Sequence, residues 1–411
     1  MTSSISLVDI GFDCMCHVAK HLHVADLKQL SITSKNFRYL FNHTIYKKYI
    51  LIRDLRKIPE RYYSSITRIK YVPKNDCIYL LSKLTNLREI DNANSVFIFA
   101  SENGHLEVVK FLLTNLKVNP SVDNNYAIGV ASQFGHIEVV KLLLTNLKVD
   151  PSSKNNYAIQ WASGNGYVEI VELLLEDPRI DPSDNYNYII KSASKYGHTE
   201  IVRLLLADSR VNPSADNNLA IKLASQFDHI EIVRLLLADS RVDPSSKNNY
   251  AIQWASDKGY VEVVKLLLKD PRVDPSANNN HAIRMAITNN HAKVAKLLLA
   301  DSRVDPSIGN NHAIAWASEG YVEVVKLLLK DSRVDPSANN NLAIGLASWN
   351  GYIEVVRLLL ADSRVNPSDN DNYAIRQANK YGHLEVVRLL SADPRISSTV
   401  KQAIKTQCLN F

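Results

Sequence analysis

Hydrophobic positions recur along most of this chain in one pattern, which is clearest in residues 123–151. Two apolar runs at helical spacing, separated by Gly135, predict two short helices. The glycine is expected in a left-handed conformation, which ends the first helix. The expected inward positions are Ala127, Ile128, Val130, Ala131, Val139, Val140, Leu143 and Leu144.

The same pattern repeats every 31 residues, with one spacing of 30 between positions 290 and 320. Asp228 and Asn290 replace the glycine in two copies, and both residue types tolerate the left-handed conformation. The glycine falls at 104, 135, 166, 197, 259, 320, 351 and 382. A 31-residue helix pair cannot bury its apolar face alone, so the ten units are expected to stack.

An asparagine stands ten residues before the glycine in most units, where the first helix begins. Asparagine is a favoured N-cap, so this residue is expected to cap the first helix. The positions so interpreted are Asn125, Asn156, Asn187, Asn218 and Asn249. Pro151 follows an extended residue and is expected to turn the chain toward the next unit.

The repeated sequence resembles ankyrin repeats in the Ala131-Ser132 pair, in Gly135-His136 and in the run from Ile137 to Leu144. The variant is similar to ankyrin proteins of amoebae and of the large DNA viruses that infect them. The resemblance implies an all-α solenoid of about ten helix-turn-helix units. It also implies a concave binding surface made by the first helices and the loops.

Residues 10–40 predict three short helices, with Asp26 and Ser34 as caps. This segment resembles an F-box, although that family usually has Leu-Pro where this chain has Ile10-Gly11. The resemblance implies docking onto a Skp-type adaptor and, through it, a cullin ubiquitin ligase. The implied adaptor-binding residues are Ile10, Gly11, Met15, Val18, Leu22, Leu27 and Leu30.

Two other interpretations of this segment stay open. It can be a generic helical cap on the array, or a metal site, since Cys14, Cys16, His17, His21 and His23 lie within ten residues. The metal site is disfavoured because Cys16 points away from the face that Cys14, His17 and His21 share on a helix. No metal and no cofactor is therefore expected.

The expected domains are an F-box-like helical module at 1–45, a connector of uncertain fold at 46–93, the array at 94–398 and a C-terminal capping helix at 399–411. Residues 123–183 match residues 216–276 at 45 of 61 positions, and 149–163 is identical to 242–256. This offset of three units indicates duplication of a multi-unit block.

Composition excludes several classes of function. The net charge of +6 is spread over 48 basic and 42 acidic residues, which does not favour nucleic acid. No apolar run is long enough for a membrane span, and no secretory signal is expected. Four scattered cysteines favour a reducing compartment, so the expected location is cytoplasmic, or the host cytoplasm for a viral protein. No catalytic motif is found, and the chain is expected to be a monomer.

Aromatic residues just before the glycines are the candidate contacts for a target protein, because variation on a repetitive frame is typical of a recognition surface. They are Phe134, Tyr196, Phe227, Trp349 and Tyr381. The alternative is that they pack on the next unit. Trp161, Trp254 and Trp316 are expected to be packing residues, and the histidine or tyrosine after each glycine is expected to form structural hydrogen bonds.

Two hypotheses for function follow. In the first, the chain is a bipartite adaptor: residues 1–45 recruit the ligase, and the array holds its target. In the second, the array sequesters a target protein without any link to ubiquitin. An enzyme is not expected.

Overall fold

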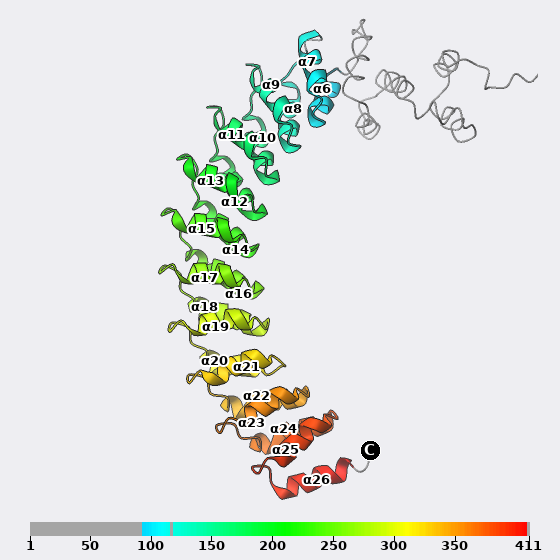
Figure 1. The fold of residues 1–411 in the computed structure, drawn as a ribbon, viewed down its shortest axis with the longest axis vertical. Helices are drawn as coiled ribbons and strands as arrows, with labels where there is room; N and C mark the ends of the chain where they lie inside the picture. Colours follow the sequence, from blue (N-terminus) through cyan, green and yellow to red (C-terminus); the bar gives the residue numbers. More distant parts are fainter. Residues whose placement is uncertain (1–92, 116–117, 409–411) are drawn as a thin grey trace, which may run out of the picture. The chain divides into compact units, whose positions relative to one another are not determined.

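The computed structural model describes residues 93–115 and 118–408, and in these ranges every element is a helix. The helices form ten consecutive pairs (Figure 1). The first helices are α6 (Ala93–Glu102), α8 (Val122–Gln133), α10 (Ser153–Asn165), α12 (Asp184–Tyr196), α14 (Ala215–Gln226), α16 (Ser246–Lys258), α18 (Ala277–Thr288), α20 (Ile308–Ala317), α22 (Ala338–Trp349) and α24 (Asp369–Lys380). The second helices are α7 (Leu106–Asn115), α9 (Ile137–Leu144), α11 (Val168–Leu175), α13 (Thr199–Ala207), α15 (Ile230–Ala238), α17 (Val261–Leu268), α19 (Ala292–Leu299), α21 (Val322–Lys330), α23 (Ile353–Leu360) and α25 (Leu384–Ala392).

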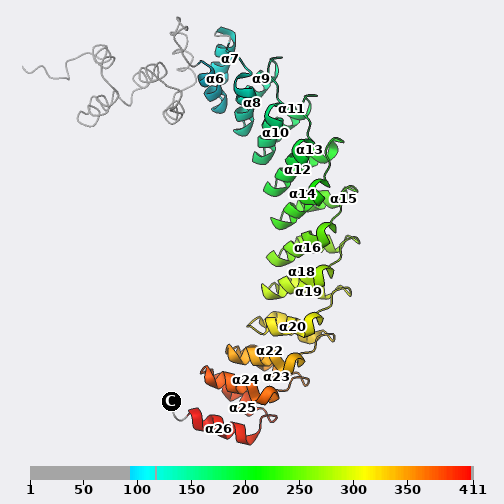
Figure 2. The same ribbon diagram turned by 180° about the vertical axis from the view of Figure 1, so that it is seen from behind.

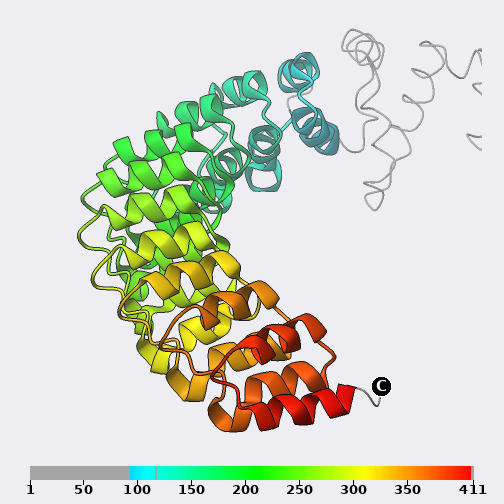
Figure 3. The same ribbon diagram turned by 60° about the horizontal axis from the view of Figure 1, so that its bottom comes forward.

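The chain divides into two compact units, residues 1–185 and 186–411. Within each unit the first helices of neighbouring pairs pack side by side, and so do the second helices (Figure 2). In the second unit they form two stacked rows (Figure 3), and a last helix, α26 (Ser398–Cys408), packs against α24. The predicted all-α stack of ankyrin-type units is therefore confirmed for the described residues.

The core lies between the two helices of each pair and between neighbouring pairs. Ala127, Ile128 and Ala131 from the first helix are buried, as are Val139 and Leu143 from the second. Every second helix except α19 also carries an exposed glutamate in its first turn, where a negative charge is favourable. The amphipathic pattern therefore predicted the buried face correctly.

The glycines adopt the predicted left-handed conformation, and the close approach of a ring from the next pair is a second constraint that requires glycine. Gly135 has φ +77°, while Asp228 and Asn290 adopt φ +60° and +58°. A Cβ on Gly135 would lie 2.5 Å from the ring of Tyr167, which belongs to the next pair. The ring after each glycine thus packs over the glycine of the preceding pair, and a side chain there would displace it.

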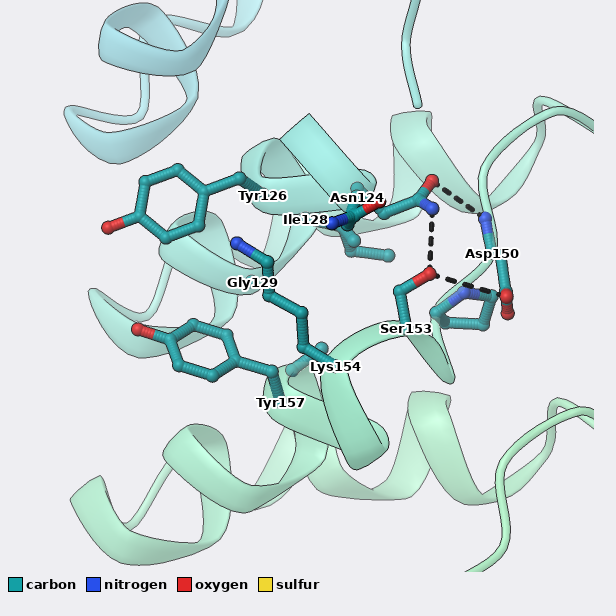
Figure 4. Close-up of a pocket in the computed structure, with 11 residues that line it drawn as sticks. Asn124, Tyr126, Ile128, Gly129, Asp150, Ser153, Lys154 and Tyr157 are labelled. Atoms are coloured by element: carbon teal, nitrogen blue, oxygen red, sulfur yellow. Dashed lines mark hydrogen bonds between the residues drawn. The ribbon is translucent and has the colours of Figure 1, made fainter. Parts of the chain in front are cut away.

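The prediction that the recurrent asparagines cap their own helices was wrong. Asn125 is the last of three consecutive left-handed residues, Asp123 to Asn125, and no side-chain cap bond forms at the start of α8 among the described residues. Its Oδ1 instead accepts the backbone N–H of Asp150 at 2.9 Å, and its Nδ2 donates to Ser153 Oγ at 2.8 Å (Figure 4). In the second unit the same acceptor role, 25 residues ahead, belongs to Asn187, Asn218, Asn249 and Asn280.

The physical reason is that asparagine is one of the few residues that tolerates the left-handed region. One left-handed turn aims its amide at the loop that leads to the next pair, where it pairs a backbone N–H that would otherwise be buried unpaired. Asparagine is therefore selected here by two neighbouring pairs rather than by one helix end.

Candidate interaction surface

The five predicted target-contact aromatics all lie at the C-terminal ends of first helices. Their side chains are exposed, by 40% for Trp349 and up to 54% for Tyr196. Phe134, Phe227 and Tyr381 follow directly after α8, α14 and α24. Exposed rings therefore recur at or next to one structural position in five of the ten pairs, which is the geometry of a surface rather than of a core.

These rings are held in place by their neighbours. Trp349 and Tyr381 come from consecutive pairs, and their ring centroids are 5.9 Å apart. The ring of Phe227 stacks on that of His229 at 6.4 Å, and the ammonium of Lys380 lies 5.3 Å from the centroid of Tyr381. The packing alternative is thus partly right, since the rings make contacts within the stack and stay accessible. Restrained aromatic side chains lose little entropy when a partner covers them.

A second group of aromatic residues lies on three other first helices, α10, α16 and α20, and its tryptophans were predicted to be packing residues. Trp161 contacts Tyr157 at 5.7 Å, Trp254 contacts Tyr250 at 5.7 Å, and Trp316 contacts His312 at 5.6 Å. Trp254 and Trp316 are half-buried, and Trp161 is 40% exposed although it packs on Tyr157, so the packing prediction holds only in part for Trp161. The signal for this group was the i, i+4 spacing of two rings on one helix face.

The duplicated stretch 149–163 has different surroundings from its copy at 242–256. In the first copy the Lys154 ammonium lies 4.5 Å from the ring centroid of Tyr126, and it reaches between the rings of Tyr126 and Tyr157 (Figure 4). The space around these residues leaves no room for a water molecule. In the second copy the position of Tyr126 holds Leu219, and an open cavity of about 420 Å³ lies beside Trp254.

Charge is unevenly distributed over the first helices. From residue 186 onward, α12, α14, α16 and α18 carry six basic residues and two acidic ones, Asp216 and Asp257. The next two first helices, α20 and α22, contain no charged residue. Burial and the nearby charge of Lys247 lower the pKa of Lys222, which is almost fully buried. The first-helix face therefore has a locally positive region in the second unit.

The recurrent histidines have the structural role that was predicted. Nε2 of His136 lies 2.7 Å from the carbonyl oxygen of Glu102, and Nε2 of His383 lies 2.8 Å from that of Trp349. Tyr321 does the same through its hydroxyl, which donates to Thr288 at 3.1 Å. No group of three metal-binding side chains comes together within the described part of the chain.

Loops on the opposite side from the aromatic ends carry a repeated Asp-x-Arg motif. In one example, the Asp301 carboxylate accepts bonds from the Arg303 guanidinium, which also donates to the carbonyl of Val273 in the preceding loop at 2.8 Å. The hydrogen bond from the arginine holds the pKa of each such aspartate below its ordinary value of 3.8. Eight such pairs occur, at Asp177, Asp208, Asp239, Asp270, Asp301, Asp331, Asp362 and Asp393. These loops link neighbouring pairs and show no sign of catalytic chemistry.

Several predictions fall on residues that the structure does not describe. The seven implied adaptor-binding residues, the candidate metal cluster and all but the last residue of the connector at 46–93 lie outside the described ranges. In the described ranges, no helix combines the length and the apolar character that crossing a bilayer requires.

Comparison with known proteins gives one family. The model for "Ankyrin repeats (3 copies)" matches the chain in overlapping spans from residue 71 to residue 401, at 71–157, 97–186, 158–248, 221–310, 283–371 and 312–401. No curated protein matches the chain. Ankyrin repeats are scaffolds for protein–protein interaction, which agrees with the exposed aromatic ends of the first helices. Because the match covers most of the sequence, the chain belongs to the ankyrin-repeat family.

Proposed function

We propose that the array holds a target protein against the exposed aromatic ends of its first helices. The observation that carries this proposal is the recurrence of an exposed ring at the C-terminal end of the first helix in five of the ten pairs. Large, rigid aromatic side chains are the type most enriched among residues that dominate binding energy. The partner surface in this proposal is a protein, and the chain contributes binding and geometry.

The finer proposal is that residues 1–45 recruit a Skp-type adaptor and its cullin ligase, so that the bound target is ubiquitinated. It rests on the resemblance of the sequence of residues 10–40 to an F-box. A second candidate is a scaffold or decoy that sequesters its target in the cytoplasm without a ligase. Ile10-Gly11 favours this second candidate, because proline pre-orders the first turn of a helix and glycine does not.

A pulldown with the full chain and with a chain lacking residues 1–45 separates the two candidates. Recovery of the adaptor and the cullin with the full chain alone supports the ligase role. If neither protein is recovered with either chain, the ligase role fails, while target binding to the array can still be tested.

Target binding is tested with Phe227→Ala, which removes a ring that is 42% exposed. We expect weaker binding by about 1–4 kcal/mol, with an unchanged melting temperature. Leu147→Ser is the matched control, because Leu147 is 96% exposed but lies in a loop away from the first helices. Equal losses in both variants would show that general surface hydrophobicity, rather than this face, binds the target.

A further inference from the structure

The cavity beside Trp254 has the lining of a binding pocket. Its residues include the rings of Tyr250 and Trp254 from α16 and of His281 from α18, with Lys247 and Asp257. Its volume of about 420 Å³ lies within the rough range of 300–1,000 Å³ that ligand pockets occupy. A large side chain therefore fits between the two helices without unfolding either of them.

Two buried nitrogen atoms near this cavity lack partners. Nδ1 of His281 and Nε of Arg284 are inaccessible to solvent and make no hydrogen bond within the described part of the chain. Burial, assisted by the charge of Arg284, lowers the pKa of His281, so its ring is uncharged at neutral pH. A buried polar atom without a partner is costly. Because neither nitrogen is accessible, a ligand would contact the rings that line the cavity rather than these two atoms.

Charge around the cavity selects the partner. The six basic residues of α12, α14, α16 and α18 outnumber the two acidic ones, and Lys222 is held close to Lys247. The ammonium of Lys258 lies 5.4 Å from the centroid of Trp254 and 3.0 Å from Asp257, and that of Lys191 lies 3.6 Å from Asp216, so both carboxylates are already paired. A carboxylate from a partner would reduce the mutual repulsion of these lysines.

We propose that this cavity receives an aromatic side chain from an acidic, extended segment of the target protein. This inference rests on the proposed target-binding role of the array. A protein segment fits better than a nucleic acid, because a strand of phosphates needs a continuous basic track. Here the basic region stops at α20 and α22, which carry no charge.

The test uses three fluorescein-labelled, N-acetylated peptides and the full chain, with fluorescence anisotropy as the readout. The peptides are Asp-Glu-Tyr-Glu-Asp, Asp-Glu-Gly-Glu-Asp and Lys-Arg-Tyr-Arg-Lys. The first is expected to bind at least about tenfold more tightly than either of the others, since it alone combines the ring with negative charge. Equal binding of the glycine peptide or of the basic peptide would overturn the proposal, and so would stronger binding of a fluorescein-labelled oligothymidylate.

The duplication supplies a matched control. Trp254→Ala is expected to weaken binding of the first peptide about tenfold, whereas Trp161→Ala, in an identical stretch of sequence, is expected to change it less than twofold. Lys247→Glu alters an exposed residue, so it tests the charge requirement without threatening the fold; a loss of about tenfold at low salt is expected. Equal effects of Trp254→Ala and Trp161→Ala would contradict the assignment of this cavity.

The outcome is separable from that of the proposed function. If Phe227→Ala releases the target but no peptide binds the cavity, the interaction face stands and the pocket is excluded. If the peptide binds through Trp254 while Phe227→Ala leaves target binding unchanged, the pocket stands and the aromatic ends lose their proposed role.

Discussion

Gly351 and Gly382 occupy equivalent places in neighbouring helix pairs, which makes a controlled substitution possible. Both have φ +77°. A Cβ on Gly351 would lie 2.5 Å from Nδ1 of His383, whereas a Cβ on Gly382 meets no described atom within 4 Å, because no further ring follows it. Alanine at either position has the same backbone strain, and only alanine at 351 also collides with a ring.

The expected magnitudes follow from these two terms. A left-handed alanine costs about 1–2 kcal/mol, which is the whole effect predicted for Gly382→Ala. Overpacking against a ring adds about 1–3 kcal/mol, so Gly351→Ala is expected to lose about 2–5 kcal/mol. The gain from a less flexible unfolded chain is the same for both substitutions and cancels in the comparison.

Hydrogen exchange across α22 to α25 is the appropriate assay, because stacked repeats open locally rather than in one transition. A double-mutant cycle isolates the collision. His383→Ala alone loses the 2.8 Å contact to Trp349, worth about 0.5–1.5 kcal/mol, but in that background Gly351→Ala should cost no more than Gly382→Ala. Equal losses at both glycines, or no coupling between Gly351 and His383, would refute the reasoning.

Three further predictions concern backbone strain, pH and buried hydroxyls. Tyr186 is 81% exposed and has φ +56°. Because asparagine tolerates that backbone conformation, Tyr186→Asn should raise the free energy of unfolding by about 1 kcal/mol; a lower unfolding midpoint in urea would contradict this. The aspartates of the eight Asp-x-Arg pairs have folded-state pKa values below 3.8. Their stabilisation is therefore present above that pH and is lost as the pH falls through the folded-state values. Melting temperatures measured from pH 7 to pH 2 should drop mainly below about pH 4. Ser225 is fully buried and its hydroxyl lacks a partner among the described residues, so Ser225→Ala should be neutral or stabilising by up to about 1 kcal/mol. Ser318→Ala removes a 2.7 Å hydrogen bond to the carbonyl of Ile314 and should destabilise the protein. A change of stability with the same sign for both variants would count against this account.

The helix pairs could be predicted from sequence because their determinants are local. Apolar spacing, a glycine after the first helix and small residues such as Ala131 all act within about a dozen positions. Asp228 and Asn290 replace the glycine in two units, and because both residue types tolerate the left-handed conformation they indicated where it occurs; both adopt positive φ. The exposure of the five aromatic ends was also expected, because each is the last residue of a first helix or the residue directly after it.

The missed features depend on residues in neighbouring pairs. Asn125 looks like a cap in sequence, because asparagine serves both N-caps and left-handed turns; its N–H partner is 25 residues ahead. The cavity beside Trp254 is lined in part by His281, which lies outside the repeated stretch, and the corresponding position 93 residues earlier holds Tyr188. A single stretch of sequence therefore cannot determine which copy carries the pocket.

The asparagine link has a consequence for how such a chain changes over evolution. Asn218 reaches Asp243, and the ring of His229 reaches Lys195, so the contacts that join pairs span about one repeat in sequence. A copied block of 93 residues therefore carries its internal bonds with it, and new contacts arise only at its seams. Gene duplication can lengthen the array at low structural risk, and the seam is where a new surface first appears.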